Sequence, residues 1–211
     1  MEEFRKLLKI TKRLLIIESF EDKSEKSIRK GKRNFQGTLH PNIFQILQKY
    51  LEVNMEIYAS PLYCYFDTCC SAFYDTDRYF GSHGSFLDFD PSEGSFECAP
   101  PNSEQVLLKA VQHIVQIITN PNKGPLSFVL FLPDWKDLEA THYLHIHSSL
   151  FACNPVKVKL QYIDKKIYGQ SNYNINSGTS IMFIIQNQQG KKKWNINHNI
   201  ENMIGELMVN Y

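Results

Sequence analysis

Residues 103–119 carry the most regular pattern of hydrophobic and polar positions in the chain. Apolar side chains recur there at every third or fourth position, so they share one face of a helix that packs on a core. A second helix is predicted to begin at Pro41, because proline is favoured in the first helical turn, and to continue to Leu51. Weaker helical patterns at about 2–18 and 199–209 predict two further helices.

Strand candidates alternate with these helices. The most pronounced is the continuous apolar run from 126 to 132, which is typical of a strand buried on both faces. The other candidates are shorter or weaker and lie at residues 55–58, 95–98, 156–163 and 179–186. A polar loop is expected between the last two, over 168–178. The alternation predicts an α/β fold in which a sheet of mainly parallel strands is covered by helices on both faces.

One edge of such a sheet is the expected place for chemistry. Ligands bind open α/β sheets beyond the carboxyl ends of the strands. The stretches that follow the predicted strands there are Ser60–Pro61, Cys98–Asn102 and Pro133–Trp135. Trp135 either stacks on a ligand or covers the end of the sheet, and the pattern favours neither.

Length, composition and charge add limits. The 211 residues are 43% hydrophobic and 21% charged, which is ordinary for a folded domain, and the formal net charge of +1 excludes a general polycation. No run approaches the length of a membrane-spanning helix, and charges interrupt the amino terminus, so neither a membrane anchor nor a secretory signal is expected. Residues 1–33 hold eleven Lys or Arg against six Asp or Glu. This basic stretch is either a solvated surface or a contact for RNA phosphates, and we expect residues 1–36 to form a basic helix and linker before a domain at 37–211.

Common local signatures of nucleotide and metal sites are missing from the sequence. The run Gly81-Ser82-His83-Gly84 is too short to predict phosphate binding. His142, His145 and His147 have a spacing that favours a surface or loop role over a metal site, so no metal is expected. The five cysteines form no CxxC pair and are predicted to be free thiols. Lys191–Lys193 are interpreted as a surface charge run rather than a phosphate contact.

The stretch Cys98-Ala99-Pro100-Pro101-Asn102 is more informative, because it places two prolines directly between a predicted strand and a predicted helix. Consecutive prolines stiffen a loop and fix the directions of its carbonyl groups. In amino-methyltransferases this loop reads Asn or Asp, Pro, Pro, then an aromatic residue. Its side-chain and proline carbonyls hold the target amine toward the methyl sulfonium, and the aromatic ring stacks on the target base.

A wider resemblance surrounds this loop. Residues 44–135 resemble the catalytic domain of the phosphorylated-CTD-interacting-factor family of cap-specific adenosine N6-methyltransferases, which act on the first transcribed nucleotide of messenger RNA. The runs that carry the resemblance occur in one order and are Tyr58–Phe66, Cys70–Asp77, Tyr79–Ser82, Gly94–Glu97, Pro100–Pro101, Pro125–Phe128 and Pro133–Trp135. Residues 180–187 fit the last strand of that domain, and no likeness is found before about residue 36.

The resemblance implies a Rossmann-like class I methyltransferase sheet flanked by helices, with S-adenosylmethionine as cofactor. It also implies capped mRNA or another RNA as partner, and a nuclear location. The residues expected to line the cofactor pocket follow the first strand or form the next matched turn, and are Ala59, Ser60, Pro61, Leu62, Phe80 and Gly81. Asp75 and Asp77 lie in a matched run and either bind a ribose or adenine or belong to a solvated loop.

Two motif positions depart from the family. The motif, Asn-Pro-Pro-Phe in the family, reads Ala99-Pro100-Pro101-Asn102 here, so Ala99 has no side-chain carbonyl and Asn102 has no ring. Loss of a transition-state hydrogen bond of this kind costs about 2.7–4 kcal/mol, a factor of about 10²–10³ in rate. Loss of a stacking ring removes about 1–3 kcal/mol of binding. Asn102 is instead predicted to cap the following helix, with Gln105 as its reciprocal partner.

Three hypotheses follow. The first is a methyltransferase-fold protein that has lost catalysis, a pseudoenzyme that keeps the S-adenosylmethionine pocket, binds RNA or serves as a subunit of another protein. The second is an active RNA adenosine methyltransferase in which Cys98, the proline carbonyls or Asn102 orient the amine. The third is a non-catalytic scaffold without a nucleotide ligand. The family's WW module is not expected here, because the tryptophans are Trp135 and Trp194 alone, and recruitment to a phosphorylated polymerase tail is therefore unsupported.

Overall fold

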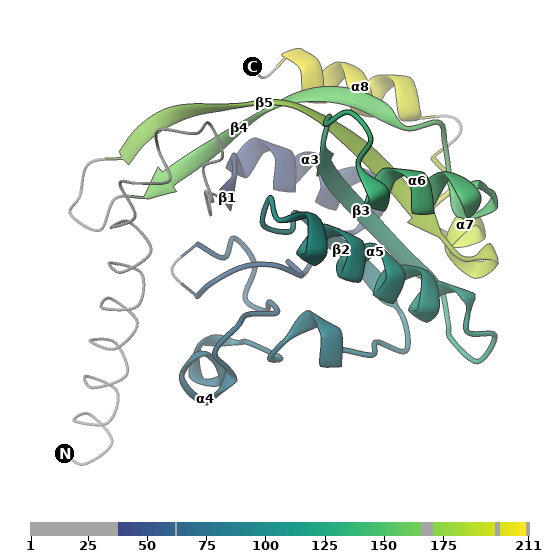
Figure 1. Cartoon of the computed structure of the whole chain (residues 1–211), viewed down its shortest axis with the longest axis horizontal. Coiled ribbons are helices and arrows are strands. Elements are labelled where there is room, and N and C mark those ends of the chain that lie inside the picture. Colours follow the sequence, from purple (N-terminus) through teal and green to yellow (C-terminus); the bar gives the residue numbers. More distant parts are fainter. Residues whose placement is uncertain (1–37, 62, 166–170, 197–198, 210–211) are drawn as a thin grey trace.

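The computed structural model of this chain describes residues 38–61, 63–165, 171–196 and 199–209. Within these ranges a sheet with the strand order β1-β4-β5-β3-β2 is flanked by helices (Figure 1). The strands are β1 (Thr38–Leu39), β2 (Gly94–Cys98), β3 (Leu126–Pro133), β4 (Val156–Lys165) and β5 (Ser171–Gln186). The helices are α3 (Pro41–Leu51), α4 (Tyr74–Asp77), α5 (Glu104–Thr119), α6 (Glu139–Ile146), α7 (Gln188–Lys193) and α8 (Ile200–Val209). The helix predicted at 2–18 and the linker lie outside the described residues.

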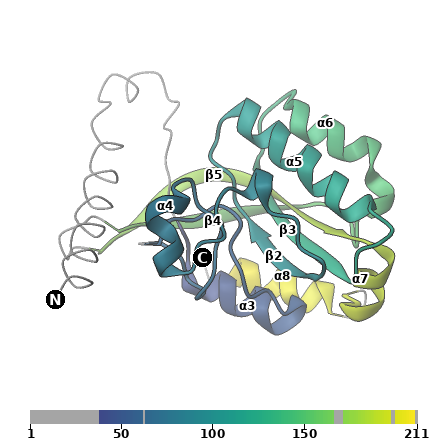
Figure 2. The ribbon, with the colours of Figure 1, turned by 90° about the horizontal axis from the view of Figure 1, so that it is seen from below.

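The strand β3 separates two hydrophobic cores. All eight of its residues are buried, as the continuous apolar run predicted. Its side chains alternate between the faces: Phe128 and Leu130 pack with α5 and α6, whereas Val129 and Phe131 pack with α3 and α8. Figure 2 shows α5 and α6 on one side of the sheet and α3 and α8 on the other. The prediction of an α/β fold with helices on both faces is confirmed.

The prediction of a mainly parallel sheet is wrong, because most pairings among β1 to β5 are antiparallel. Only β2 and β3 pair in parallel, joined through α5, whereas β3/β5, β4/β5 and β1/β4 are antiparallel. The cause is β5, which lies between β3 and β4 and runs against both. Residues 166–170 are all that separate β4 from β5, and a connection this short joins antiparallel neighbours.

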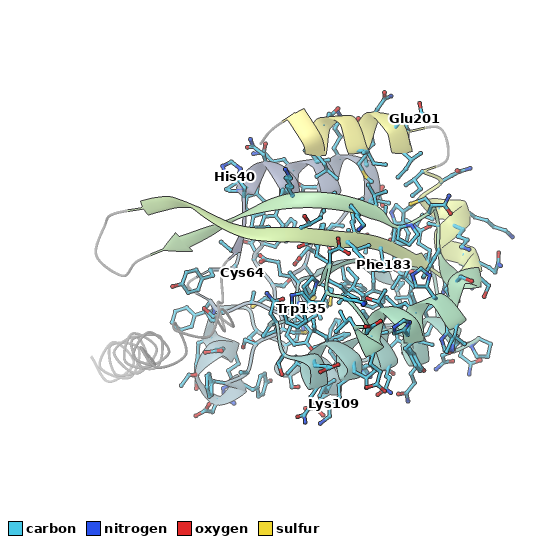
Figure 3. The ribbon with its side chains drawn as sticks, turned by 45° about the horizontal axis from the view of Figure 1, so that its top comes forward. His40, Cys64, Lys109, Trp135, Phe183 and Glu201 are labelled. Carbon is cyan, nitrogen blue, oxygen red and sulfur yellow. The ribbon has the colours of Figure 1, made fainter. Side chains whose placement is uncertain are left out.

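The predicted polar loop at 168–178 is also wrong from residue 171 onward. The strand β5 begins at Ser171, and its polar residues pair with β4 up to the register Lys165↔Ser171. Figure 3 shows both strands extending beyond the rest of the sheet; it also places His40 and Glu201 on one face and Lys109 of α5 on the other. Backbone pairing between two long neighbours holds this stretch extended in spite of its polar composition.

The other side of the sheet is irregular. The strand predicted at 55–58 is reduced to a single bridge position, Glu56, which pairs in parallel with Glu97 of β2 and with Cys69. Cys69 in turn pairs in parallel with Ser82. The Ile57 amide donates to the Glu97 carbonyl at 2.8 Å, and the Cys70 amide donates to the Glu56 carbonyl at 2.8 Å. Three short segments therefore continue the sheet beyond β2 through isolated bridges.

Helix ends in the structure test the capping predictions. Pro41 stands in the first turn of α3, and His40 caps that helix through its Nδ1 atom, which accepts from the Asn42 amide at 3.2 Å. The prediction that Asn102 caps α5 is wrong, because Ser103 occupies the cap position and its side chain makes no capping hydrogen bond. The α5 helix is held instead by its apolar face, which is buried from Leu107 to Ile118.

The helices α4, α6 and α7 were not predicted. His142 and His145 lie on α6 and are exposed, so of the expected surface or loop role the surface position is confirmed. The lysine run forms the second half of α7, in which Lys191 donates to the Ser149 carbonyl at 2.7 Å and Lys193 lies over the Trp194 ring. In the described ranges, none of the helices is long and apolar enough to cross a bilayer.

Candidate ligand-binding site

A pocket opens where the bridge segment at Glu56 and the strand β2 end side by side. Its enclosed volume is about 10 Å³, which is room for about one water molecule, within about 290 Å³ of space that includes open solvent at the mouth. The lining residues come from β1, α3, the segment that follows Met55, and the end of β2, and are Thr38, Leu39, Phe44, Glu56, Tyr58, Ala59, Ser60, Tyr63, Glu97 and Ala99. Four separate parts of the chain thus line one pocket.

The period of the strand explains why an acid reaches this pocket. Phe96 and Cys98 pack into the core beneath α5. Because successive side chains of a strand point to opposite faces, Glu97 lies on the α3 face, where Phe44 forms part of the pocket wall. The mouth is closed on one side by a turn in which the amides of Tyr63 and Cys64 donate to the Ser60 carbonyl at 2.9 Å.

Two carboxyl groups share this pocket and differ in their surroundings. Glu56 accepts hydrogen bonds from the backbone amides of Tyr65 and Phe66. Glu97 is 1% exposed, and burial together with the nearby Glu56 raises the pKa of its carboxyl well above the ordinary value. The geometry therefore favours a neutral, protonated Glu97 beside a hydrogen-bonded Glu56.

Two polar atoms in the pocket wall lack hydrogen-bond partners in the described part of the chain. They are Oε1 of Glu97 and Oγ of Ser60, and both are buried. Buried polar atoms are nearly always satisfied, so unsatisfied atoms that line a pocket mark positions where a ligand or water completes the bonding.

Three other titratable groups close to the pocket, Tyr58, Cys70 and Cys98, are kept neutral by burial. Burial, with the thiols of Cys98 and Cys70 nearby, raises the pKa of Tyr58. Burial also raises the pKa of the Cys98 thiol, and that of Cys70 to about 12. All five cysteines are free, as predicted. A buried neutral thiol is a poor nucleophile and a weak hydrogen-bond acceptor, so Cys98 is a packing residue here.

The degenerate motif lies at the pocket only in part. Ala99 lines the pocket, and its methyl group supplies no acceptor. Pro100 is buried, Pro101 is exposed and Asn102 is half-buried, and none of the three lines the pocket. The carbonyl of Pro101 accepts from the Ser103 amide at 2.7 Å, so this carbonyl is already engaged within the loop.

The structure brings some of the predicted cofactor residues together and separates others. Ala59 and Ser60 line the pocket, whereas Pro61, Phe80 and Gly81 do not, and Leu62 lies outside the described residues. Phe80 and Gly81 belong to the outermost bridge segment, where the Cys69 amide donates to the Gly81 carbonyl at 3.1 Å. Their assignment to a cofactor therefore stays a prediction.

Sequence reasoning missed the two glutamates and the pocket residues from β1 and α3. A charged residue inside the otherwise uncharged strand Ser95–Cys98 was the available signal for Glu97. For Thr38, Leu39 and Phe44 no local signal existed, because β1 reaches the pocket while paired with the distant strand β4, and Phe44 reaches it through the packing of α3.

The remaining candidates lie outside the pocket. Asp77 is buried and accepts from the Thr76 hydroxyl at 2.9 Å, which is a structural contact, and Asp75 is exposed. Trp135 is 44% exposed just past the end of β3, and its role stays a prediction. In the residues the structure describes, no group of three or more potential metal ligands converges.

Comparisons with known proteins add a family match. Residues 6–167 match a family described as "Phosphorylated CTD interacting factor 1 WW domain". The match begins at residue 6, so the prediction that the likeness starts near residue 36 is wrong. The description names a WW domain, yet the matched residues contain a single tryptophan, Trp135, and lie largely over the α/β domain.

Two curated relatives are similar to this chain. They are the proteins named mRNA (2'-O-methyladenosine-N(6)-)-methyltransferase from Homo sapiens and from Mus musculus. Each is 36% identical over 168 residues, which is 75% of this chain and 23% of the relative. The chain thus spans about a quarter of the length of the curated relatives it matches.

Proposed function

The chain belongs to the phosphorylated CTD interacting factor 1 family, and from this premise we propose that it is a methyltransferase-fold domain that binds S-adenosylmethionine but transfers its methyl group poorly or not at all. The pocket between the Glu56 segment and β2 is the cofactor site in this proposal. Capped mRNA or another RNA is the proposed macromolecular partner, and the nuclear location implied by the family belongs to the same proposal.

The order of the segments across the sheet supports the site. With the two-residue β1 set aside, the segments run in space as Ser82, Cys69, Glu56, β2 and β3, which are third, second, first, fourth and fifth along the chain. All these pairings are parallel. This is the order of the doubly wound Rossmann-like sheets, in which ligands bind where the order reverses, beyond the ends of the first and fourth strands. The pocket lies at that point.

The observation that carries the loss of activity is Ala99. It occupies the pocket wall at the motif position where amino-methyltransferases hold the target amine with an amide or carboxyl group. Removal of one such transition-state acceptor costs about 2.7–4 kcal/mol. In this proposal the domain keeps its cofactor site and lacks a side chain that orients the acceptor.

Three of the candidate substitutes for the missing acceptor are poorly placed in the described part of the chain. Cys98 is fully buried in its thiol form, and Asn102 is not among the pocket-lining residues. The Pro101 carbonyl is engaged by Ser103. The Pro100 carbonyl is the one other candidate for an altered acceptor, and the loss of the remaining three supports the impaired enzyme over the active one.

The test has two stages on the full 211-residue chain. Calorimetric titration with S-adenosylmethionine and S-adenosylhomocysteine measures binding, and we expect micromolar affinity. Methyl transfer to a capped RNA that begins with adenosine is then compared between wild type, Ala99→Asn, Asn102→Phe and the double variant. We expect transfer by the double variant at a rate at least about 10²-fold above wild type. Robust turnover by wild type contradicts the impairment, and absence of binding contradicts the cofactor site.

A further inference from the structure

Two thiols lie together in the turn that closes one side of the pocket mouth. This turn begins where the Cys64 amide donates to the Ser60 carbonyl at 2.9 Å. The Sγ atom of Cys64 lies 3.0 Å from the carbonyl oxygen of Phe66 and 3.7 Å from that of Thr68, the residue bonded to Cys69. The chain therefore folds back on itself between the two cysteines, and the Cys64 thiol donates a hydrogen bond to the sulfur of Cys69.

The residues between the two cysteines are held by the pocket wall. Tyr65 stacks on Phe44 of α3, with ring centroids 4.8 Å apart, and Phe66 meets the same ring edge-on at 5.5 Å. Glu56 accepts hydrogen bonds from the amides of Tyr65 and Phe66. Phe44 and Glu56 both line the pocket. The packing thus keeps the two sulfur atoms near each other, and a link between them would fix a turn that contacts the pocket wall.

This pair differs from the other cysteines in access and in reactivity. Cys64 is half-buried, so a small solute reaches it, whereas Cys69 is buried. The hydrogen bond from Cys64 lowers the pKa of the Cys69 thiol, and the same bond together with burial raises the pKa of Cys64. Burial raises the thiol pKa of Cys70, Cys98 and Cys153. Because the thiolate is the reactive form, the pair is the most favourable place in the chain for thiol oxidation.

We propose that Cys64 and Cys69 are a modification site at which a peroxide forms a reversible disulfide within the chain. The ring closes over residues 64–69 and holds the Tyr65 and Phe66 amides against Glu56, so it clamps this side of the pocket. The inference goes beyond the proposed function, because it needs neither a cofactor nor RNA.

Hydrogen peroxide is the oxidant, and the reaction has two steps. The Sγ atom of Cys64 attacks one peroxide oxygen, the O–O bond breaks, and the released hydroxide takes the thiol proton and leaves as water. The Sγ atom of Cys69 then attacks the sulfur of the resulting sulfenic acid. The S–S bond forms, the S–O bond breaks, and the second hydroxide leaves as water with the proton of Cys69. The thiols lose two electrons, which reduce the peroxide to water, and a dithiol reductant reverses the change.

The experiment treats the reduced full chain with hydrogen peroxide, counts free thiols by alkylation and maps the peptides without reduction. Cleavage after Tyr65 and Phe66 falls between the two cysteines, so a disulfide keeps the two peptides joined. We expect the free thiols to fall from five to three and to return with dithiothreitol. Hydrogen exchange at the Tyr65 and Phe66 amides should slow at least about threefold in the oxidised chain, because the ring restricts local opening.

Four variants assign the disulfide to this pair. Cys64→Ala and Cys69→Ala should each prevent it, and in Cys69→Ala a sulfenic acid on Cys64 should be trapped by a 1,3-dione. Cys70→Ala tests the neighbour of Cys69, and Cys153→Ala tests the other half-buried thiol. Both controls should still lose two thiols to the disulfide.

The outcomes are distinct, and the mapping uses wild type, so it does not depend on how well the variants fold. The disulfide site is overturned if wild type keeps all five thiols, if the joined peptides contain Cys153, or if Cys69→Ala still forms an internal disulfide. The clamp is overturned if the disulfide forms and exchange at Tyr65 and Phe66 is unchanged. Neither result bears on S-adenosylmethionine binding, which is measured separately.

Discussion

The two sides of the sheet are built in different ways. On one side, β3 and β5 pair over seven positions, from Ser127↔Gln186 to Pro133↔Ser180, between two hydrophobic cores. On the other side, the segments at Glu56, Cys69 and Ser82 each contribute one bridge position and are joined by loops. The pocket lies on the boundary between them. The comparison indicates that the regular side supplies most of the stability, whereas the irregular side supplies walls of the proposed binding site.

The largest effect is expected from the regular side. Leu130 is fully buried in β3 between α5 and β5, and Leu130→Ala should lower the free energy of unfolding by about 2–5 kcal/mol through a lost side chain and a residual cavity. Chemical denaturation measures the loss. Ile146→Ala is the control, because Ile146 is 80% exposed and should change stability by less than about 0.5 kcal/mol. Equal losses in both variants would contradict the assignment of stability to this core.

A smaller and more local effect is expected at Gly81. Its φ is +88°, and a Cβ atom there would lie 2.0 Å from the Asp67 carbonyl oxygen, so Gly81→Ala should cost about 1–3 kcal/mol. Hydrogen exchange at the Cys69 amide, which donates to Gly81, should accelerate more than exchange in β3. Gly205→Ala provides the matched control, since nothing lies within 4 Å of its Cβ position. Uniform acceleration throughout the chain would show that the two sides do not open separately.

The buried carboxyl group of Glu97 predicts that the free energy of unfolding depends on pH. The pKa of Glu97 is higher in the folded than in the unfolded chain, so the folded state binds more protons between these two values. The contribution of Glu97 to stability is complete below the unfolded pKa near 4.5 and is lost as the pH rises through the folded value. The slope has a limit of about 1.4 kcal/mol per pH unit. Relative to wild type, Glu97→Gln should therefore gain stability between pH 5 and 8, measured by thermal unfolding. A constant difference across this range would mean that Glu97 is ionised in the fold.

The smallest effect is expected at the motif position Asn102. Because Ser103 rather than Asn102 stands at the cap of α5, Asn102→Ala should change stability by less than about 0.5 kcal/mol. By contrast, Asn187→Ala should cost about 1 kcal/mol or more, because its side chain caps α7 through the Gly190 amide at 2.7 Å and also binds the Leu126 amide. A loss at Asn102 as large as that at Asn187 would restore Asn102 as a structural residue.

The sequence-based predictions are also more accurate for the regular side of the sheet than for the irregular side. Periodicity located α3, α5, α8, β2 and β3, because each buries a continuous or regularly spaced apolar face. It missed the start of β5 at Ser171, where pairing with β4 rather than local preference holds polar residues extended. It also took 55–58 for an ordinary strand, although only Glu56 is in a bridge.

The candidate site was also predictable only in part. The rule that ligands bind beyond strand ends selected Ser60 and Ala99, which do line the pocket. The rule cannot identify walls that come from elsewhere in the chain, such as Phe44 of α3. Nor does the rule show that Oε1 of Glu97 lacks a hydrogen-bond partner among the described residues, which depends on how the surrounding segments pack.

The most direct test of the central claim is a calorimetric titration of S-adenosylmethionine into wild type and into Ser60→Phe, which fills the pocket from its wall. Ser148→Phe, at an exposed position away from the pocket, is the control. The account predicts micromolar binding by wild type and the control and no binding by Ser60→Phe, with all three proteins folded by circular dichroism. Unchanged binding by Ser60→Phe, or no binding by wild type, would contradict the assignment of this pocket as the cofactor site.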